Sequence, residues 1–371
     1  MKDLFEIIND EQETYSDDSL YNITSFGTDM TFREIMSMYV EGDIEKPELQ
    51  RKYVWTKKEA SRFIDSILLG LPVPSIFLAK TSESKLLIVD GYQRIMTVHD
   101  YIDGKFSGDG SLFRLTNSEI IHSQWRGKSY SELTEPQKRA LRMYTIHAIV
   151  FEQKHPQNDT GMYQIFERIN TGGQPLKPQE IRNCVYHGKF NSMLTDLNHD
   201  DNWRKIVGSE KEDSRMLDIE LILRFFAFNG LREKHFDVIQ INLIKYLNDY
   251  MSEHNSIDDF EREQNEKLFR STMSFLFNQL GSNCFRTCKN KDGRISWSKK
   301  VNPVVMDAVS VATIIAKENN CIDDQMNYAN KYIELLQNPD FISVTKSHTT
   351  KIDNINKRVE LAAAIIYGIE I

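Results

Sequence analysis

With 371 residues, the chain is long enough for two domains, each with a hydrophobic core of its own. Hydrophobic residues make up 40% and charged residues 27%, which is ordinary for a folded protein and argues against disorder. The net charge of −8 at pH 7 excludes a surface coated with positive charge, so any contact with nucleic acid must be confined to one face.

Residues 1–22 and the four cysteines bear on where the protein works. The first 22 residues are acidic and lack a long apolar core, which predicts neither a signal peptide nor a transit sequence. No apolar run approaches the roughly 20 residues that span a bilayer. The cysteines fit reduced thiols, with a zinc site at Cys284 and Cys288 as the alternative. We expect a cytoplasmic protein without membrane contact.

Helix and strand patterns alternate in the first half of the chain. Thr31 with Glu34, and Thr56 with Glu59, have the capping-box spacing that predicts the start of a helix. The expected strands are residues 74–80, 85–90 and 145–151, and further helices are expected directly after residue 91 and at 135–142, 160–169 and 178–188.

The second half of the chain reads as successive helices, each with apolar residues at helical spacing. They are expected at residues 217–228, 236–251, 256–280, 304–318 and 323–336, with a last helix ending near 369. The sequence therefore predicts an α+β protein, with a mixed α/β domain over residues 1–195 and an all-helical domain over residues 196–371. The boundary is expected between residues 190 and 215.

The stretch "LLIVDGYQRIMTVHDYI", residues 86–102, carries the most chemistry. A strand that ends in Asp90-Gly91 and leads straight into a helix brings backbone N–H groups and the positive helix end to one place, where an anion is stabilised. Gly91 allows a close backbone approach, and Arg94 can bind phosphate oxygens. Asp90 can hold Mg²⁺ or a sugar hydroxyl. These residues predict a phosphate site.

A purely structural interpretation of the same residues stays open. Asp90 followed by Gln93 three residues later is itself a capping-box pattern, and Gly91 can simply relax a turn.

Two other segments bear on this choice. In the first, Gln50 and Arg51 precede Trp55 and a capped helix. The second is a small-residue loop rich in N–H donors, formed by Asn170, Thr171, Gly172 and Gly173.

Together, "PELQRKYVW", "VDGYQRIMT" and "FERINTGGQPLKPQEIRN" resemble three motifs of the N-terminal domain of GmrSD-type restriction endonucleases, and they occur in the same order. This "DGQQR" family is related in fold to ParB and sulfiredoxin. The resemblance extends from about residue 30 to 190, and more loosely into the helical region. One departure lies in the signature itself, where Tyr92 replaces the first glutamine.

The resemblance implies a module that binds and hydrolyses a nucleoside triphosphate with Mg²⁺ in defence against foreign DNA. The implied nucleotide-binding residues are Gln50, Arg51, Asp90, Gly91, Tyr92, Gln93, Arg94, Thr97, Asn170, Thr171, Gly172 and Gly173. Asp90, Gln93 and Arg94 are the candidate catalytic residues, and Asp90 is the candidate metal ligand. For Thr97, a buried hydroxyl bonded back to the helix is the alternative role.

GmrSD-type enzymes cut DNA with a separate His-containing nuclease domain, and residues 200–371 show no such histidine cluster. His99 and His199 are each isolated and are expected to be structural. The expected partners are therefore a nucleoside triphosphate, DNA and a separate nuclease or effector subunit, with the oligomeric state left open. One alternative is a binding module without turnover, which Tyr92 favours. Another is a ParB-like metal-dependent nickase, which rests on fold analogy.

Two further hypotheses concern aromatic residues beside basic ones. Arg51 is expected to face Arg94 across a shared cleft, with Trp55 packed beneath; alternatively Arg51 is solvated and Trp55 only staples the helix start. The basic segment "FRTCKNKDGRISWSKK", residues 285–300, can contact a nucleic-acid backbone while Trp297 stacks on a base, or it can be a solvated loop.

Overall fold

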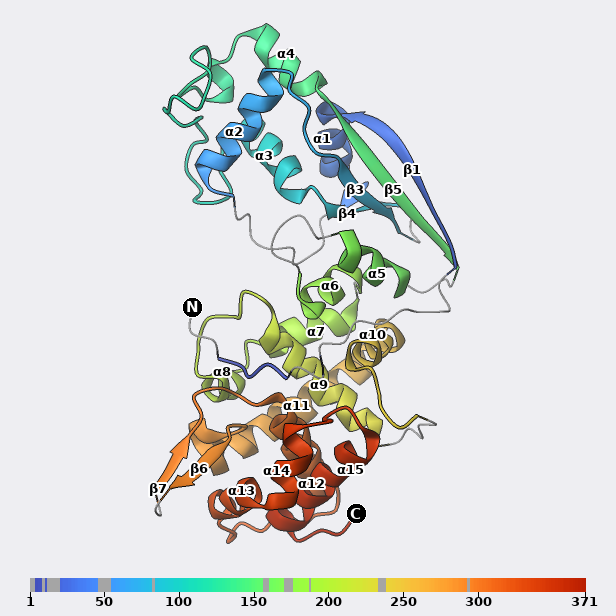
Figure 1. The fold of residues 1–371 in the computed structure, drawn as a ribbon, viewed down its shortest axis with the longest axis vertical. Coiled ribbons are helices and arrows are strands. Elements are labelled where there is room, and N and C mark those ends of the chain that lie inside the picture. Colours follow the sequence, from blue (N-terminus) through green and yellow to red (C-terminus); the bar gives the residue numbers. More distant parts are fainter. Residues whose placement is uncertain are drawn as a thin grey trace. The chain divides into compact units, whose positions relative to one another are not determined.

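The computed structural model of the chain describes most of its residues and is shown as a ribbon in Figure 1. The described residues are 4–8, 11, 21–45, 55–81, 84–155, 160–169, 176–186, 188–232, 238–291 and 294–371. None of the helices in these ranges is both long and apolar enough to cross a membrane.

The chain divides into two compact units. The helical unit comprises Met1–Ser16, Lys177–Arg182 and Tyr186–Ile371, and the α/β unit comprises Asp17–Leu176 and Asn183–Val185. The α/β unit is thus inserted between the start of the chain and the rest of the helical unit. The sequence analysis placed everything up to residue 195 in one domain, because local patterns do not reveal contacts between the two ends of a chain.

Within the described residues, the α/β unit is built on a five-stranded mixed sheet with the order β1-β5-β3-β4-β2. The strands are β1 (Tyr21–Thr31), β2 (Ile44–Glu45), β3 (Ile76–Lys80), β4 (Leu86–Asp90) and β5 (Thr145–His155). Strand β5 runs antiparallel to β1 and parallel to β3, while β4 runs antiparallel to β3 and parallel to β2. This order places the end of β4 beside the start of β3.

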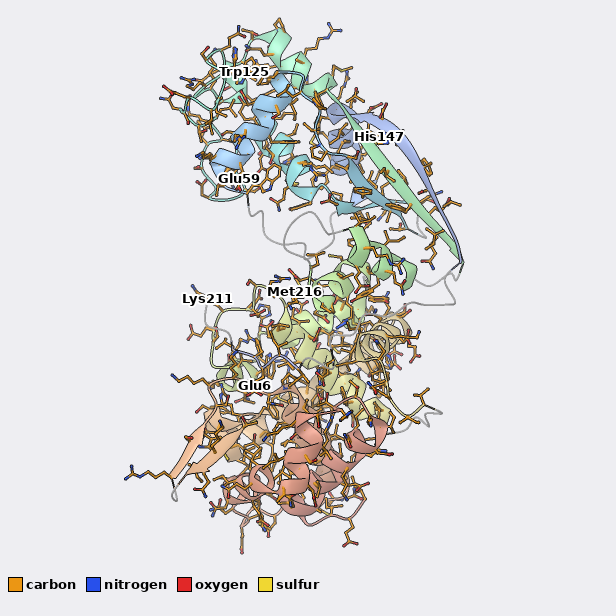
Figure 2. The ribbon with its side chains drawn as sticks, viewed as in Figure 1. Glu6, Glu59, Trp125, His147, Lys211 and Met216 are labelled. Carbon is orange, nitrogen blue, oxygen red and sulfur yellow. The ribbon has the colours of Figure 1, made fainter. Side chains whose placement is uncertain are left out.

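Helices of the α/β unit begin where the sequence signals predict. They are α1 (Phe32–Glu41), α2 (Lys57–Leu68), α3 (Tyr92–Asp103), α4 (Glu135–Met143) and α5 (Thr160–Ile169), with a short 3-10 turn, η2 (Tyr130–Glu132). Both expected capping boxes are present: the backbone N–H of Thr31 donates to Glu34 over 2.7 Å, and that of Thr56 donates to Glu59 over 2.8 Å. Glu59 is labelled in Figure 2.

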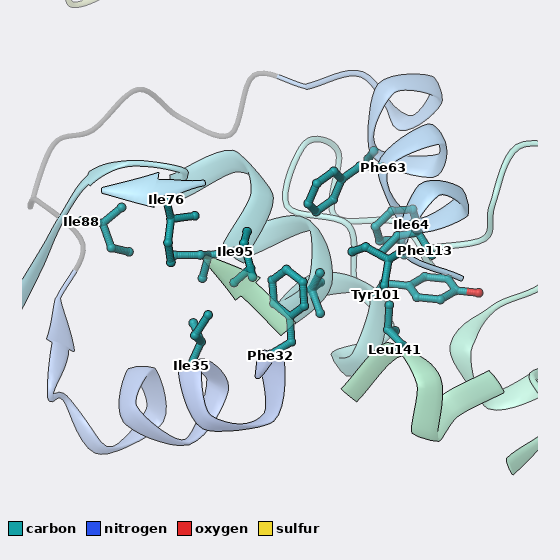
Figure 3. Close-up of a cluster of buried hydrophobic side chains, with 14 of the residues drawn as sticks. Phe32, Ile35, Phe63, Ile64, Ile76, Ile88, Ile95, Tyr101, Phe113 and Leu141 are labelled. Atoms are coloured by element: carbon teal, nitrogen blue, oxygen red, sulfur yellow. The ribbon is translucent and has the colours of Figure 1, made fainter. Parts of the chain in front are cut away.

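One face of the sheet carries the hydrophobic core of the α/β unit, where side chains from β3, β4 and β5 meet α1–α4 (Figure 3). The buried side chains drawn and labelled there are Phe32, Ile35, Phe63, Ile64, Ile76, Ile88, Ile95, Tyr101, Phe113 and Leu141. On β4, Leu87 and Val89 point to the opposite face and are also buried, and α5 packs against this strand. Strand β4 is therefore covered on both faces, which fixes the position of its last residue.

Helices α6 (Pro178–Val185) to α15 follow in chain order. The remaining helices are α7 (Lys189–Leu197), α8 (Asp201–Val207), α9 (Leu217–Leu231), α10 (Leu243–His254), α11 (Asp259–Leu280), α12 (Pro303–Glu318), α13 (Tyr328–Gln337), α14 (Pro339–Lys346) and α15 (Ile352–Ala362), with a 3-10 turn η3 (Gly281–Asn283) and a π-helical turn η4 (Ala363–Tyr367). Helix α12 is the centre of the helical unit, because it is buried along nearly its whole length and packs against α9, α15 and η4.

A buried ionic network joins the start of the chain to three helices of the helical unit. The Arg224 guanidinium lies 2.5 Å from Asp307 and 2.8 Å from Glu11. Arg358 lies 3.4 Å from the same Asp307 and donates to the Thr349 carbonyl, and the Thr349 hydroxyl donates to Glu11 over 3.1 Å. Two cations face two anions here, so the buried charges balance.

The predicted α+β architecture is confirmed, with one correction in the second half of the chain. The helical unit also contains a two-stranded antiparallel hairpin among its described residues, formed by β6 (Cys288–Lys291) and β7 (Arg294–Trp297). The sequence between these strands is Asp292-Gly293, a strong signal for a two-residue hairpin turn. The expectation of an all-helical domain missed this signal because the strands are short and polar.

Candidate functional site

The junction between β4 and α3 is held by a glycine that no other residue can replace without strain. Gly91 is the N-cap of α3, with φ 103°, in the left-handed region. A Cβ at this position would lie 2.3 Å from Cγ2 of Ile76 on β3. The turn therefore needs glycine both for its backbone angle and for its close approach to the neighbouring strand.

The helix start at Gly91 has the features of an anion site. Glycine has no side chain, so unlike Asp, Ser or Thr at an N-cap it offers no oxygen to the N–H groups of the first turn. The capping box expected for Asp90 and Gln93 does not form, because Asp90 is the last residue of β4 and not the N-cap. The structural interpretation of this motif is thus wrong in its capping part and correct in assigning Gly91 to a turn.

Asp90 and Arg94 lie side by side, one helical turn apart. The Arg94 guanidinium donates to Oδ2 of Asp90 over 3.3 Å and to the carbonyl of Ser75 over 2.8 Å. The Arg94 side chain is 17% exposed and that of Asp90 is 36% exposed, so the arginine is held in place while the carboxylate keeps access to solvent. Within the described residues, Oδ1 of Asp90 accepts no hydrogen bond, which leaves it open to a cation or a hydroxyl.

Gln93 connects this junction to the segment before α2. Its side-chain oxygen accepts a hydrogen bond from the backbone N–H of Trp55 over 3.4 Å. The Trp55 ring packs edge-on against Phe63 of α2, with 5.5 Å between ring centroids. Trp55 thus packs against the helix that it precedes and bonds to the signature, and its expected place beneath an Arg51 wall stays a prediction.

Tyr92, the departure from the family signature, is half-buried against the hydrophobic core. Burial, together with the nearby Tyr39 and Asp100, raises the pKa of Tyr92 to about 12. The phenol therefore keeps its proton at neutral pH. Tyr39 belongs to α1, so the ring of Tyr92 lies on the side of α3 that packs against that helix.

Thr97 occupies the middle of α3 and is fully buried. Its hydroxyl donates to the Gln93 carbonyl over 2.7 Å, which is the back-bonded arrangement considered as its alternative role. The observed hydrogen bond satisfies the buried hydroxyl within the helix, and a role for Thr97 in ligand binding stays a prediction.

Six of the predicted site residues lie outside the described residues. They are Gln50, Arg51, Asn170, Thr171, Gly172 and Gly173. The structure does place the segments that flank them: Trp55 bonds to Gln93, and α5, which ends at Ile169, packs against β4. The cleft with Arg51 and Arg94 on opposite walls stays a prediction.

The expected metal chemistry rests on a single carboxylate. In the part of the chain that the structure describes, no group of three or more His, Cys, Asp or Glu side chains could hold a metal ion. This includes Cys284 and Cys288, for which the structure gives no zinc site. Mg²⁺ in nucleotide sites is commonly held by one or two carboxylates plus phosphates, so Asp90 fits such an ion only together with a phosphate ligand.

The two histidines expected to be structural are both engaged with nearby groups. His99 lies 3.5 Å from the buried carboxylate of Asp100, and this hydrogen bond raises the pKa of His99. Asp100 also accepts hydrogen bonds from Ser107. His199 bonds the Thr195 carbonyl over 2.9 Å and lies 2.9 Å from Glu212.

Sequence reasoning missed the groups that hold the site from β3. The Ser75 carbonyl fixes Arg94, and Ile76 excludes any side chain at position 91. Neither residue carries a motif, and only the antiparallel pairing of β3 with β4 brings them to the junction. The placement of Ser75 and Ile76 was therefore not accessible from local sequence.

A mixed sheet places a carboxylate, a glycine with positive φ and an arginine at the start of a helix, which defines an α/β domain of the strand-turn-helix type. Residues 32–187 match the family model described as the GmrSD restriction endonuclease, N-terminal domain. The chain carries a domain of this family, which confirms the resemblance seen in its motifs. A comparison with curated proteins finds no match. The family match indicates a component of a GmrSD-like restriction or defence system.

Proposed function

We propose that this chain binds a nucleoside triphosphate at the start of α3 and hydrolyses it, as the nucleotide-dependent module of a GmrSD-like restriction or defence system. The observation that carries the proposal is the pairing of Asp90 and Arg94 across the turn at Gly91. The family match over residues 32–187 supports the biological setting.

The phosphate groups are the part of the ligand that the junction suits best. Backbone N–H groups of the first turn and the positive end of α3 favour negative charge, and Gly91 adds no side-chain oxygen that would repel an anion. Arg94 adds a fixed cation, because its guanidinium is already positioned by Ser75 and Asp90. A preorganised donor of this kind loses little entropy when phosphate binds.

Binding a triphosphate beside the Asp90 carboxylate requires a second cation. A carboxylate beside a triphosphate is repelled unless positive charge lies between them, and Arg94 supplies only one charge. The Oδ1 oxygen of Asp90 could take Mg²⁺, which would neutralise phosphate charge and stabilise the leaving group during hydrolysis. Gln93, whose side-chain oxygen accepts a hydrogen bond from the Trp55 N–H, would orient the attacking water molecule.

A second candidate is a regulator that binds nucleotide without turnover. The observation in its favour is Tyr92, whose half-buried ring fills the position of a signature glutamine. In this candidate the nucleotide state, and not its hydrolysis, controls a separate nuclease or effector subunit that acts on DNA.

Phosphate release separates the two candidates. The pure chain is incubated with each of the four common ribonucleoside triphosphates and Mg²⁺, with a Tyr92→Gln variant in parallel. The proposal expects steady phosphate release by the parent with at least one nucleotide. Binding without release by the parent, together with release by Tyr92→Gln, would favour the regulator, and absence of binding to all four would contradict both candidates.

A further inference from the structure

The β6–β7 hairpin of the helical unit has one basic face and one apolar face. In its register, Lys289 lies opposite Ser296, and Cys288 lies opposite Trp297. Directly opposed residues project from the same face of an antiparallel pair, and alternate residues along a strand share a face. Lys289, Ser296 and Arg294 therefore project from one face of the hairpin.

The apolar face is turned toward the body of the helical unit. The Trp297 ring stacks on Tyr332 of α13, with 5.9 Å between centroids and 12° between planes, and Tyr332 is buried. This contact covers one face of the Trp297 ring, and the expected stacking of that ring on a base stays a prediction. In Figure 1 and Figure 2 the hairpin projects from the helices of its unit.

The base of the hairpin is fixed from two sides. The Tyr332 hydroxyl donates a hydrogen bond to the Arg286 carbonyl over 2.9 Å. The Arg286 guanidinium in turn donates to the carbonyls of Ile206 and Val207 at the end of α8. Because α8 and α13 both hold the residues that lead into β6, the basic face has a defined position on the unit.

Positive charge is concentrated on this hairpin in an otherwise acidic chain. Residues 286–300 contain six basic residues and one acidic residue, whereas the whole chain carries a net charge of −8. Lys289, Arg294 and Lys299 are exposed. In the described ranges, none of these three side chains forms an ion pair with a carboxylate, so their charge is available to a partner.

We propose that the β6–β7 hairpin binds the phosphate backbone of duplex DNA. Exposed cations on one face of a narrow β-ribbon suit a polyanion, and a two-stranded ribbon has the width to enter the major groove. The inference goes beyond the nucleotide site, because it concerns the helical unit and needs no bound triphosphate. Lys289 and Arg294 are the phosphate ligands, and Ser296 on the same face donates its hydroxyl to the Lys289 carbonyl over 3.4 Å.

The test measures DNA binding as a function of salt. A fluorescein-labelled duplex of mixed sequence is titrated with the full chain, without nucleotide, and the dissociation constant is followed by anisotropy from about 50 to 200 mM NaCl. Each lost phosphate contact should change the slope of log K against log salt by about 0.9. The double variant Lys289→Ala/Arg294→Ala should therefore flatten the slope by about 1.8 and weaken binding by about tenfold or more at the lowest salt.

Two controls separate charge from folding and from general surface effects. The variant Lys289→Arg/Arg294→Lys keeps both charges and should keep the parent slope. The variant Lys267→Ala/Lys346→Ala removes two exposed charges from α11 and α14 of the same unit and should also keep the parent slope. All variants should share the thermal midpoint of the parent, because the changed side chains are exposed.

Three results would overturn the proposal. The first is a parent that shows no salt-dependent binding to the duplex, and the second is a Lys289→Ala/Arg294→Ala variant with the parent slope. The third is labelled poly-glutamate that binds the parent as tightly as DNA, since that result would point to an acidic protein as the partner. None of these outcomes depends on the nucleotide site, so they leave the proposed triphosphate binding untouched.

Discussion

At the scale of single residues, Asp90 and Arg94 show what local sequence can predict. Their spacing of four residues across the start of a helix places them on neighbouring positions, and the structure shows a 3.3 Å contact between them. Arg94 also bonds the Ser75 carbonyl, which depends on strand pairing and carries no sequence signal. The side chains of the site were thus predictable, while the backbone groups that hold them were not.

Gly91 gives a residue-scale prediction about stability. Gly91→Ala should lower the free energy of unfolding by about 2–4 kcal/mol, because it combines a strained positive φ with a clash against Ile76. Gly110→Ala is the matched control, since Gly110 also has positive φ but has no atom closer than 3.9 Å to its Cβ position. It should cost about 1 kcal/mol.

Urea unfolding of both glycine variants measures the difference between them. If Ile76 of β3 blocks a side chain at position 91, Gly91→Ala should lower the free energy of unfolding clearly more than Gly110→Ala does. Equal losses would mean that Ile76 moves aside easily and that only the backbone angle requires glycine.

At the scale of elements, the sequence predicted helix starts and apolar strands correctly. The capping boxes at Thr31 and Thr56 begin α1 and α2, and the apolar runs became β3 and β4. Helix α10 begins at Leu243, later than expected, because Asn242 provides the N-cap and the preceding described residues are not helical. Helix boundaries thus follow the cap and not the first apolar residue of a periodic pattern.

Strand β1 and the β6–β7 hairpin show where element prediction failed. Strand β1, Tyr21–Thr31, pairs along its length with β5, and its partner is more than a hundred residues away in sequence. Its polar and exposed residues give no apolar alternation, so its pairing with β5 defines it. The hairpin had a local signal in Asp292-Gly293, which the helical patterns on either side obscured.

At the scale of the whole chain, the first residues and the helical unit fold together. The backbone N–H of Glu6 donates to Val301, and Glu11 lies in the buried network with Arg224. Such contacts join residues more than two hundred positions apart, which no periodicity in the sequence can show. Because these contacts place the first residues in the helical unit, the compact α/β unit begins at Asp17 and not at residue 1, where the predicted domain started.

The buried network makes a prediction for the helical unit. Glu11→Ala should lower its free energy of unfolding by about 3–5 kcal/mol, because Arg224 would keep a buried charge with one carboxylate removed. Glu360→Ala is the matched control, since it breaks an exposed pair with Lys357 and should cost less than about 1 kcal/mol. Urea unfolding followed by circular dichroism measures both variants. Similar decreases in the free energy of unfolding would show that the network does not depend on Glu11.

Calorimetric titration with a non-hydrolysable triphosphate and Mg²⁺ tests most directly whether the start of α3 is a nucleotide site. The parent should bind, and Arg94→Ala should lose about 2–5 kcal/mol of binding free energy, because a partly buried charge-assisted bond to phosphate disappears. Arg62→Ala, which removes an exposed arginine from α2, should bind like the parent. Equal affinity in the parent and Arg94→Ala would contradict the assignment of phosphate binding to this junction.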